Sequence, residues 1–492
     1  MTGVHAVSRR FLVKSALAAG FALAAHNVRA AEARTGMQMT RRSIRIGGRT
    51  IAYDAEAGET LLRDDKGRPS AALFTFSYIR RDAPGTGRPV IFFFGGGPGG
   101  SALSWHFLSM GPRIAVSESD QVERYRIVDN PGCLIDEADL VFIDPVGSGF
   151  SRVLPGVPER RYWGLFEDAE CFARFIRAWL DDHGRGRCPV YIAGVSYGTV
   201  RAATLSHRLH ALGTPLAGVI LNSSVISYAS TRFAPGNDLP YIYFLPSYAA
   251  VHHFHRSAAR GTDLRSHLNR AEAFALERYA PALAWGERLD SVRRRQVADE
   301  MSDLVGLPTD YLLSADLKVK SEQFMADYGR QLGIMLDRSD GRVAGLAEAD
   351  RVKAFRDAPP YLETPIGMAF RRYLTDELGV SIDRPYIYLA LVGGSNWNYE
   401  DGSYGRPFDN VDMAVALADD MRANPRLRVM MAAGYYDLAT PYFASEMVLS
   451  SRNLPRGRLV KRHYEAGHGV DRDPASLVVF QRDLRELVGG RS

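Results

Sequence analysis

Short strand-like runs separated by amphipathic stretches follow one another along most of this chain. The runs lie at 90–94, 190–195, 216–221, 427–433 and 459–464. Before the second run, apolar residues recur at the spacing of one helix face, at Phe172, Phe175, Ile176, Trp179 and Leu180. Near the start of the chain, residues 43–53 alternate polar and apolar around Gly47-Gly48, which predicts a β-hairpin. The pattern predicts an α/β protein whose strands alternate with helices.

The run at 190–195 leads into Gly194-Val195-Ser196-Tyr197-Gly198, a Gly-x-Ser-x-Gly motif, and a helical pattern follows. A serine between a strand and a helix sits on a strained turn, and only small neighbours leave room for that turn. Gly194 and Gly198 supply this room, so we expect the Ser196 hydroxyl to stand clear of the sheet. Ser196 is therefore the candidate nucleophile.

Two partners follow later strand-like runs in chain order. Asp437 comes just after 427–433, and His468 lies between two glycines just after 459–464. A neutral His468 would accept the Ser196 proton, while Asp437 would hold its tautomer and stabilise the imidazolium. His463 is a rival base, but it falls inside the strand pattern. The order Ser, Asp, His is that of the α/β-hydrolase fold, and it predicts a catalytic triad.

A glycine-rich segment, 95–100, follows the buried run at 90–94. Backbone N–H groups of such a loop can bind a developing oxyanion, and the N–H of Tyr197, just after the nucleophile, supplies a second donor. The same glycines match the dinucleotide pattern Gly-x-Gly-x-x-Gly. Pro98 removes a donor from the middle of that pattern, and no clear βαβ unit follows, so we interpret the segment as an oxyanion loop.

The chain resembles the serine carboxypeptidases, particularly their bacterial branch. The matching segments are spread over nearly all of the chain, at Gly96-Gly97-Pro98-Gly99, Gly111-Pro112, 142–151, the Ser196 turn, 433–441 and Ala466-Gly467-His468. The resemblance implies an α/β-hydrolase fold with a central, mostly parallel sheet, a large helical cap insertion and no metal or cofactor. It places the triad on Ser196, Asp437 and His468. It also places the oxyanion donors on Gly97 and Tyr197, with Gly96 among the substrate-binding positions.

Three positions depart from the family pattern. Family carboxypeptidases bind the substrate's C-terminal carboxylate through an Asn and two acidic residues, whose positions here hold Gly95, Ser109 and Val195. Carboxyls that share a proton suit acidic pH, so we expect no strongly acidic optimum. Arg113, next to Gly111-Pro112, could bind a carboxylate instead, although a solvated surface arginine is the simpler interpretation.

The spacing of the triad locates an insertion. Ser196 and Asp437 are 241 residues apart, whereas Asp437 and His468 are 31 apart, and too few strands separate the first pair to fill the gap. We expect a first hydrolase core segment at 31–225, a helical cap insertion at 226–385 and a second core segment at 386–492. The aromatic run 241–248 would either line the substrate pocket or pack inside the cap.

Residues 1–30 have the features of a targeting segment. Ser8-Arg9-Arg10-Phe11-Leu12-Val13-Lys14 resembles a twin-arginine signal, and the apolar stretch 16–25 is too short to span a bilayer of about 30 Å. We expect a protein exported to the periplasm or outside the cell, with no integral membrane span. Removing 1–30 takes away four basic residues and no acids, so the net charge falls from +5 to +1. Nothing then indicates a nucleic-acid partner.

Three cysteines are too few for a disulfide scaffold. Export would permit one bond, between Cys171 and Cys188, leaving out Cys133. Cys171 also lies on the apolar helix face and fits the core. His252-His253-x-His255 does not predict a metal site, because alternation in an extended segment would separate the imidazoles; we interpret it as polar cap surface. No metal or cofactor is expected.

The sequence therefore predicts a serine hydrolase, most specifically a serine-type carboxypeptidase that removes C-terminal residues from peptides through an acyl-enzyme. The expected partner is a peptide or ester substrate. An esterase or acyltransferase on the same fold is the main alternative, because of Gly95, Ser109 and Val195. A catalytically inactive hydrolase fold used for binding in the envelope is a second alternative, which the complete triad disfavours.

Overall fold

This computed structural model describes residues 33–118, 124–256, 263–390, 397–399 and 411–490. Its strands are β1 (Ala33–Ile46), β2 (Arg49–Arg63), β3 (Pro69–Arg80), β4 (Val90–Phe94), β5 (Arg113–Ser117), β6 (Tyr125–Asp129), β7 (Asp139–Ile143), β8 (Arg152–Val153), β9 (Val190–Val195), β10 (Gly218–Asn222), β11 (Arg428–Gly434) and β12 (Leu459–Tyr464). All but β5 and β6 form one sheet, in the order β1-β2-β3-β7-β4-β9-β10-β11-β12, with β8 paired to β3. β5 and β6 form a separate antiparallel hairpin.

The strands from β7 to β12 in this order are parallel, whereas β1, β2 and β3 pair antiparallel at one edge. A central parallel strand is covered on both faces, and all five residues of β4 are buried. In β2, by contrast, residues 51–57 alternate between buried and partly exposed. The predicted fold class, α/β with a mostly parallel central sheet, is confirmed.

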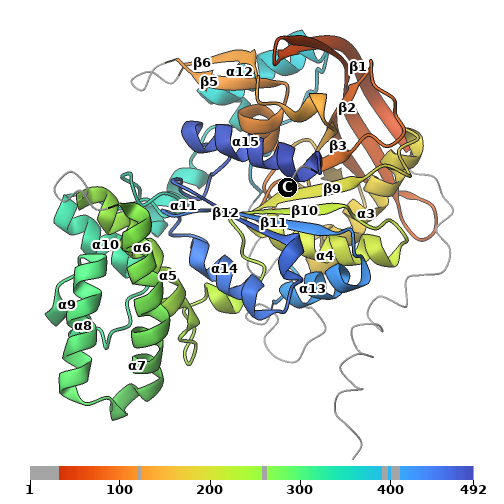
Figure 1. Cartoon of the computed structure of the whole chain (residues 1–492). Coiled ribbons are helices and arrows are strands. Elements are labelled where there is room, and N and C mark those ends of the chain that lie inside the picture. Colours follow the sequence, from red (N-terminus) through yellow and green to blue (C-terminus); the bar gives the residue numbers. More distant parts are fainter. Residues whose placement is uncertain (1–32, 119–123, 257–262, 391–396, 400–410, 491–492) are drawn as a thin grey trace, which may run out of the picture.

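Helices cover both faces of the sheet (Figure 1). One face carries α3 (Leu165–Asp182), α4 (Tyr197–Ala211), α13 (Ala414–Ala423) and α14 (Tyr442–Ser451); the other carries α15 (Pro474–Val488), the short α2 (Leu103–Trp105) and the π-helix η1 (His106–Met110). Side chains of β4 alternate between the two layers. Phe92 packs edge-on against Trp179 of α3, and Phe93 against Trp105 of α2, with ring centroids 5.5 Å and 5.4 Å apart.

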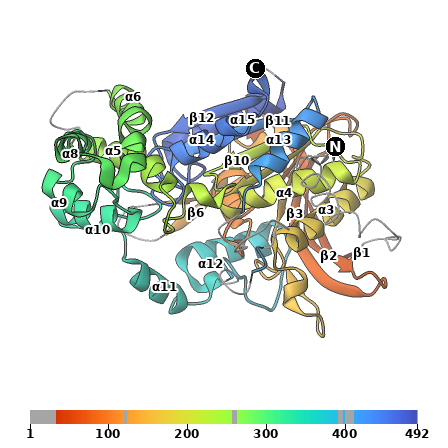
Figure 2. The same ribbon diagram turned by 90° about the horizontal axis from the view of Figure 1, so that it is seen from below.

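Most helices between β10 and β11 form a lobe beside the core (Figures 1 and 2). These are α5 (Leu239–Arg256), α6 (Leu264–Phe274), η6 (Ala275–Tyr279), α7 (Ala280–Trp285), α8 (Ser291–Val305), α9 (Thr309–Ser314) and α10 (Ser321–Leu332), with α11 (Glu348–Arg356) after them. Further along, α12 (Pro365–Arg372) and η9 (Tyr373–Glu377) lie against the core, where Tyr373 stacks on Phe107 with ring centroids 5.3 Å apart. The boundaries expected for the cap, 226 and 385, stay a prediction.

Two local expectations are confirmed, and one ring of the aromatic run is found to pack inside the lobe. β1 and β2 form the hairpin, with Gly47 and Gly48 in the left-handed turn at φ of 55° and 78°. The apolar face of α3 is buried in the core. In the aromatic run, Tyr248 is buried and stacks on Phe324 at 4.2 Å, so this ring packs inside the lobe.

Cys133, Cys171 and Cys188 are buried thiols, so the disulfide that export would permit is not formed. The Cys188 Sγ donates to the Gly85 carbonyl at 3.1 Å. The expected signal, 1–30, lies outside the described residues. None of the described helices is long and apolar enough to cross a membrane.

Candidate active site

Ser196 lies on the sharp turn between β9 and α4. Its backbone is at φ 58° and ψ −127°, a positive φ that a residue with a side chain rarely adopts and that costs of order 1–3 kcal/mol. Two hydrogen bonds hold it there: the Ser196 N–H donates to the Asn222 carbonyl at 3.0 Å, and the Thr199 N–H donates to the Ser196 carbonyl at 2.9 Å. The strained turn expected from the motif is present.

The two motif glycines are required by close backbone packing. A Cβ on Gly194 would lie 2.1 Å from the Gly198 carbonyl oxygen, and a Cβ on Gly198 would lie 2.7 Å from the Gly95 carbonyl oxygen. No side chain can occupy either position without moving the turn.

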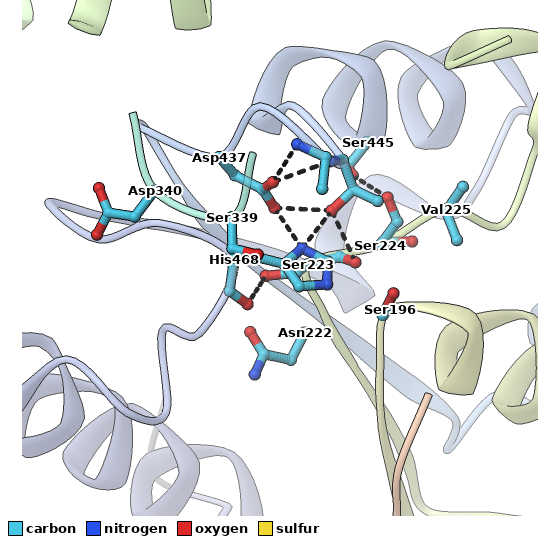
Figure 3. A network of polar contacts seen from close by, with 12 residues as sticks. Ser196, Asn222, Ser223, Ser224, Val225, Ser339, Asp340, Asp437, Ser445 and His468 are labelled. Atoms are coloured by element: carbon cyan, nitrogen blue, oxygen red, sulfur yellow. Dashed lines mark hydrogen bonds and ion pairs between the residues drawn. The ribbon is translucent and has the colours of Figure 1, made fainter. Parts of the chain in front are cut away.

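Asp437 and His468 meet at the same end of the sheet (Figure 3). Asp437 follows β11 and is fully buried, and its Oδ2 accepts from the His468 Nδ1 at 2.8 Å. Its Oδ1 accepts from the N–H groups of Ala439 and Thr440, at 2.7 Å and 2.9 Å, and the Thr440 hydroxyl donates to Oδ2 at 2.7 Å. The carboxylate therefore has a fixed orientation, and its bond to Nδ1 leaves the imidazole Nε2 as the acceptor.

The backbone of His468 is anchored on both sides. Its N–H donates to the Ser339 carbonyl at 2.6 Å, and its carbonyl accepts from the Ser223 hydroxyl at 2.8 Å. Ser223 follows β10, while Ser339 belongs to the segment between α10 and α11. In the view of Figure 3, Ser196 lies on the side of the imidazole opposite Asp437.

The glycine-rich loop lies against the nucleophile turn. A Cβ on Gly96 would lie 2.8 Å from the Ser196 Cβ and 3.2 Å from the Tyr197 nitrogen. Gly97, at φ 110°, lines the same cavity as Ser196 and Tyr197. The two expected oxyanion donors are thus brought together at Ser196.

A buried arginine fixes the start of this loop. Arg201 of α4 donates to the Gly95 carbonyl at 2.6 Å and forms an ion pair with Asp168 of α3 at 2.5 Å. Its guanidinium also lies over the ring of Phe172, 4.9 Å from the centroid. Burial raises the pKa of Asp168, although the charge of Arg201 lowers it. Sequence reasoning missed this pair, since no local pattern links 168, 201 and 95.

The family's carboxylate-binding positions are filled differently. A Cβ on Gly95 would lie 2.2 Å from the Ser101 carbonyl oxygen, so no asparagine fits there. Ser109 is fully buried, and its hydroxyl lies 3.4 Å from the Asp471 carboxylate, which also accepts from Asn222 at 2.8 Å. A carboxylate from the loop after His468 thus occupies this region, although position 109 itself has none.

Arg113 is not placed at the site. It lies on β5 and forms ion pairs with Asp129 at 2.5 Å and with Glu377 at 3.0 Å. Two carboxylates already neutralise and orient the guanidinium, so the suggestion that Arg113 binds a substrate carboxylate is corrected.

Arg472 is the cation that lies beside His468 instead. The turn that begins at Gly469 brings it there, because the Arg472 N–H donates to the Gly469 carbonyl at 2.9 Å. A Cβ on Gly469 would lie 2.5 Å from the Arg472 Nε, so the guanidinium covers the residue next to the imidazole. Arg472 is exposed, and within the described part of the chain it makes no side-chain hydrogen bond or ion pair. Desolvation of the guanidinium lowers the pKa of Arg472, but Tyr388 and the nearby carboxylates of Asp471, Asp337 and Asp437 raise it overall.

Metal ligation has no candidate in the described ranges, where no group of three or more His, Cys, Asp or Glu could hold an ion. His252, His253 and His255 lie on the helix α5 rather than on an extended segment. His252 is buried and hydrogen-bonded to the Tyr328 hydroxyl at 3.0 Å, so it is not cap surface.

Residues 64–222 match the family model described as serine carboxypeptidase. Serine carboxypeptidase-like 36 of Arabidopsis thaliana is 32% identical over 133 residues, 26% of this chain and 26% of the relative. The resemblance to serine carboxypeptidases is confirmed. Serine carboxypeptidase-like 9 of the same plant is 28% identical over 145 residues, 29% of this chain and 32% of that one. The chain thus matches these serine carboxypeptidase relatives over about a quarter to a third of their length, and the matches support a serine hydrolase.

Solved structures similar to the chain include a proline iminopeptidase from Mycobacterium smegmatis, 13% identical, covering 92% of this chain and 100% of that one with a TM-score of 0.37. A peroxisomal α/β-hydrolase from Saccharomyces cerevisiae is 11% identical and covers 93% of this chain and 91% of its own, with a TM-score of 0.38.

Proposed function

We propose that this chain is a serine-type carboxypeptidase with Ser196 as nucleophile, His468 as general base and acid, and Asp437 as the group that orients the imidazole. The strained turn at Ser196 and the 2.8 Å bond between Asp437 and His468 support this assignment. Gly97 and Tyr197 are the proposed oxyanion donors, because both line the cavity at Ser196.

The proposed reaction has two halves. The Ser196 oxygen attacks the scissile carbonyl carbon while its proton passes to the His468 Nε2, and the N–H groups of Gly97 and Tyr197 stabilise the oxyanion. His468 then gives this proton to the leaving nitrogen, and the C–N bond breaks. Water attacks the acyl-enzyme, loses its proton to His468, and that proton returns to the serine oxygen as the acid is released.

The position of Arg472 favours a carboxypeptidase over other serine hydrolases. The leaving residue must lie beside His468, because it receives its proton from the imidazole. Arg472 covers Gly469 next to this histidine and forms no side-chain hydrogen bond or ion pair with a described residue, although the charges of Asp471 and Asp437 act on it. A guanidinium binds a carboxylate through two parallel hydrogen bonds. We therefore assign Arg472 to the C-terminal carboxylate of the leaving residue, in place of the family groups absent at 95, 109 and 195.

The test compares three substrates with one acyl group: a blocked dipeptide acid, its amide and a simple ester. In the wild-type protein we expect kcat/KM for the acid to exceed that for the amide. In Arg472→Met this ratio should fall by about 10- to 100-fold, because a hydrogen bond to a charged group contributes about 1.5–3 kcal/mol. Arg472→Lys should keep part of it, since an ammonium retains the charge but not the bidentate geometry.

Arg293→Met is the matched control. Among the described residues this exposed arginine of α8 pairs with Asp290 alone, one turn away, and its substitution should leave the acid-to-amide ratio unchanged. An unchanged ratio in Arg472→Met would contradict the assignment of Arg472. A wild-type protein that hydrolyses the ester and ignores the carboxylate would contradict the carboxypeptidase itself.

An esterase or acyltransferase is the second candidate, favoured by the lack of paired carboxyls at Gly95, Ser109 and Val195. Its distinguishing result is a preference for the ester, with an added alcohol or amine accepting the acyl group. Labelling with a fluorophosphonate that disappears in Ser196→Ala would separate either enzyme from an inactive hydrolase fold.

We also propose that residues 1–30 export the protein to the periplasm or beyond. The twin arginines Arg9 and Arg10 and the short apolar stretch support this. Replacing both arginines by lysine should keep the protein in the cytoplasmic fraction of a bacterial host. Unchanged export would contradict the proposal.

A further inference from the structure

A cavity of about 640 Å³ opens at Ser196, between the core and the helical lobe. Ser196, Gly97 and Tyr197 form one part of its wall. Residues that follow β10 form another, among them the aromatic side chains of Tyr228 and Phe233. The rest comes from the insertion, at Lys320, Glu322 and Arg338, and from the loop that follows Asp437. The proposed nucleophile and oxyanion donors thus face a chamber partly built by the lobe.

This cavity lies on the acyl side of the reaction. It is lined by Ser196 and the proposed oxyanion donors but, within the described chain, His468 is not part of the lining. The leaving group lies beside His468, because it takes a proton from the imidazole. The part of the substrate that stays bonded to Ser196 therefore extends into the cavity.

The charge of the lining is positive. Its described residues include three cations, Arg232, Lys320 and Arg338, against one acid, Glu322. Lys320 and Arg338 are exposed and form no ion pair with any described residue. Arg232 lies over the ring of Tyr228, 5.5 Å from its centroid. Cations gathered in a concave site raise the local concentration of anions.

The neighbouring cations Lys318 and Arg342 are neutralised, which distinguishes Lys320 and Arg338 from them. Lys318, two residues before Lys320, pairs with Asp238 at 2.7 Å. Arg342, four residues after Arg338, pairs with Asp340 at 2.6 Å and with Asp473 at 2.9 Å. Of these four cations, the two that line the cavity, Lys320 and Arg338, are the two without an ion pair among the described residues.

We propose that this cavity selects a carboxylate on the acyl group, so that the substrate carries a negative charge on the acyl side of the scissile bond. Lys320 and Arg338 bind the carboxylate, and Tyr228 and Phe233 pack against the carbon chain that bears it. The carboxylate belongs to an acidic side chain of a peptide or to a dicarboxylic acyl ester. The inference rests on acylation of Ser196, as proposed above, and holds for either type of leaving group.

The experiment uses blocked dipeptide acids with Glu or Gln as the acyl residue, and nitrophenyl esters of the same two blocked residues. In the wild-type protein kcat/KM for Glu should exceed that for Gln by about 10-fold or more, because the Glu carboxylate forms charged hydrogen bonds with Lys320 and Arg338 that the Gln amide cannot form. The ratio should fall as ionic strength rises, since these side chains are exposed. In Lys320→Met/Arg338→Met it should fall to about 1. Lys320→Glu/Arg338→Glu should reverse the preference in favour of a Lys substrate.

Lys318→Met is the control, because that cation is already paired, and it should keep the wild-type ratio. A Glu-to-Gln ratio near 1 in the wild-type protein, or one that the double substitution leaves unchanged, overturns the inference. If only the esters are hydrolysed but Glu is still preferred, the carboxypeptidase proposal fails and the inference stands. If the Glu and Gln peptides are cleaved equally well, the carboxypeptidase proposal stands and the inference about the cavity fails. A comparison of fluorophosphonate labelling rates verifies that each variant is folded.

Discussion

At Gly96 the oxyanion loop touches the nucleophile turn with no room for a side chain. A Cβ there would lie 2.5 Å from the Val195 carbonyl oxygen and 2.8 Å from the Ser196 Cβ. Gly194 and Gly198 pack as closely from within the turn. Glycine at these positions allows the two backbone segments to pack in direct contact. This contact sets the spacing between Ser196 and the N–H groups that would stabilise the oxyanion of the substrate.

Gly96→Ala should slow fluorophosphonate labelling of Ser196 by about 100-fold, because displacing reacting groups by about 1 Å has an effect of that size. Overpacking should also lower the free energy of unfolding by about 1–3 kcal/mol. Gly457→Ala is the control, since a Cβ there meets nothing within 4 Å. Labelling of Gly96→Ala at the wild-type rate would show that the loop does not position the oxyanion donors.

Ser196, Asp437 and His468 were predictable because each follows a strand within a short local motif. Arg472, Lys320 and Arg338 were not, because nothing in their own segments marks them. Lys320 and Arg338 face a cavity without an ion pair among the described residues, and Arg472 lies over Gly469 beside His468. These properties depend on the folded structure rather than on a local sequence motif. Arg113 was misjudged for the same reason, since Glu377 pairs with it from 264 residues away.

At the level of secondary-structure elements, Arg201 connects α4, α3 and the loop after β4 beside the nucleophile. It extends from α4, pairs with Asp168 on α3 and donates to the Gly95 carbonyl just after β4. The oxyanion loop is thereby held to the two helices that cover its face of the sheet. The side chain of Arg201 is fully buried, so the pair is shielded from solvent.

Arg201→Met should lower the free energy of unfolding by about 3–5 kcal/mol, because it leaves the Asp168 carboxylate buried without its counter-charge. Arg201→Met/Asp168→Asn should recover part of this stability and still label slowly, since the Gly95 carbonyl remains untethered. Urea midpoints and labelling rates measure the two effects separately. Wild-type labelling in the double variant would mean that Arg201 stabilises the fold without positioning the loop.

The sheet could be predicted from sequence, and the path of the insertion could not. Buried parallel strands such as β4 are apolar throughout, so they are visible in the pattern. Helices α5 and α12 both have apolar faces, yet the first belongs to the lobe and the second packs near β5 and β6. An apolar face predicts burial but does not specify its partner.

At the scale of the whole molecule, His106 lies where the end of the insertion returns to the core. Its imidazole stacks on Phe76 with centroids 4.2 Å apart, and Tyr78, which is hydrogen-bonded to it, also contacts the Tyr373 hydroxyl at 2.7 Å. Burial lowers the pKa of His106 to about 3. The native protein therefore holds this imidazole neutral at pH values where the unfolded chain would protonate it.

This difference makes stability depend on pH. The folded pKa lies below the unfolded value of about 6.5. The stabilisation that comes from keeping His106 neutral is therefore fully present above pH 6.5 and is lost as pH falls toward 3. Between pH 6.5 and 4.5 the free energy of unfolding of the wild-type protein should fall by about 2 kcal/mol more than that of His106→Gln. Urea titrations at both pH values measure this, and parallel profiles for the two proteins would contradict it.

The backbone bond between His468 and Ser339 has a consequence for how far this protein can be shortened. Ser339 lies one residue after Arg338, and Arg342 also ties the same segment to the Glu465 carbonyl and to Asp473, on either side of His468. Deleting the insertion to leave a minimal hydrolase would therefore remove the hydrogen bonds that hold the backbone around His468, the proposed base. It would also remove part of the wall of the cavity at Ser196. Swapping lobes between relatives should succeed only when the 337–342 segment stays with its own C-terminal half.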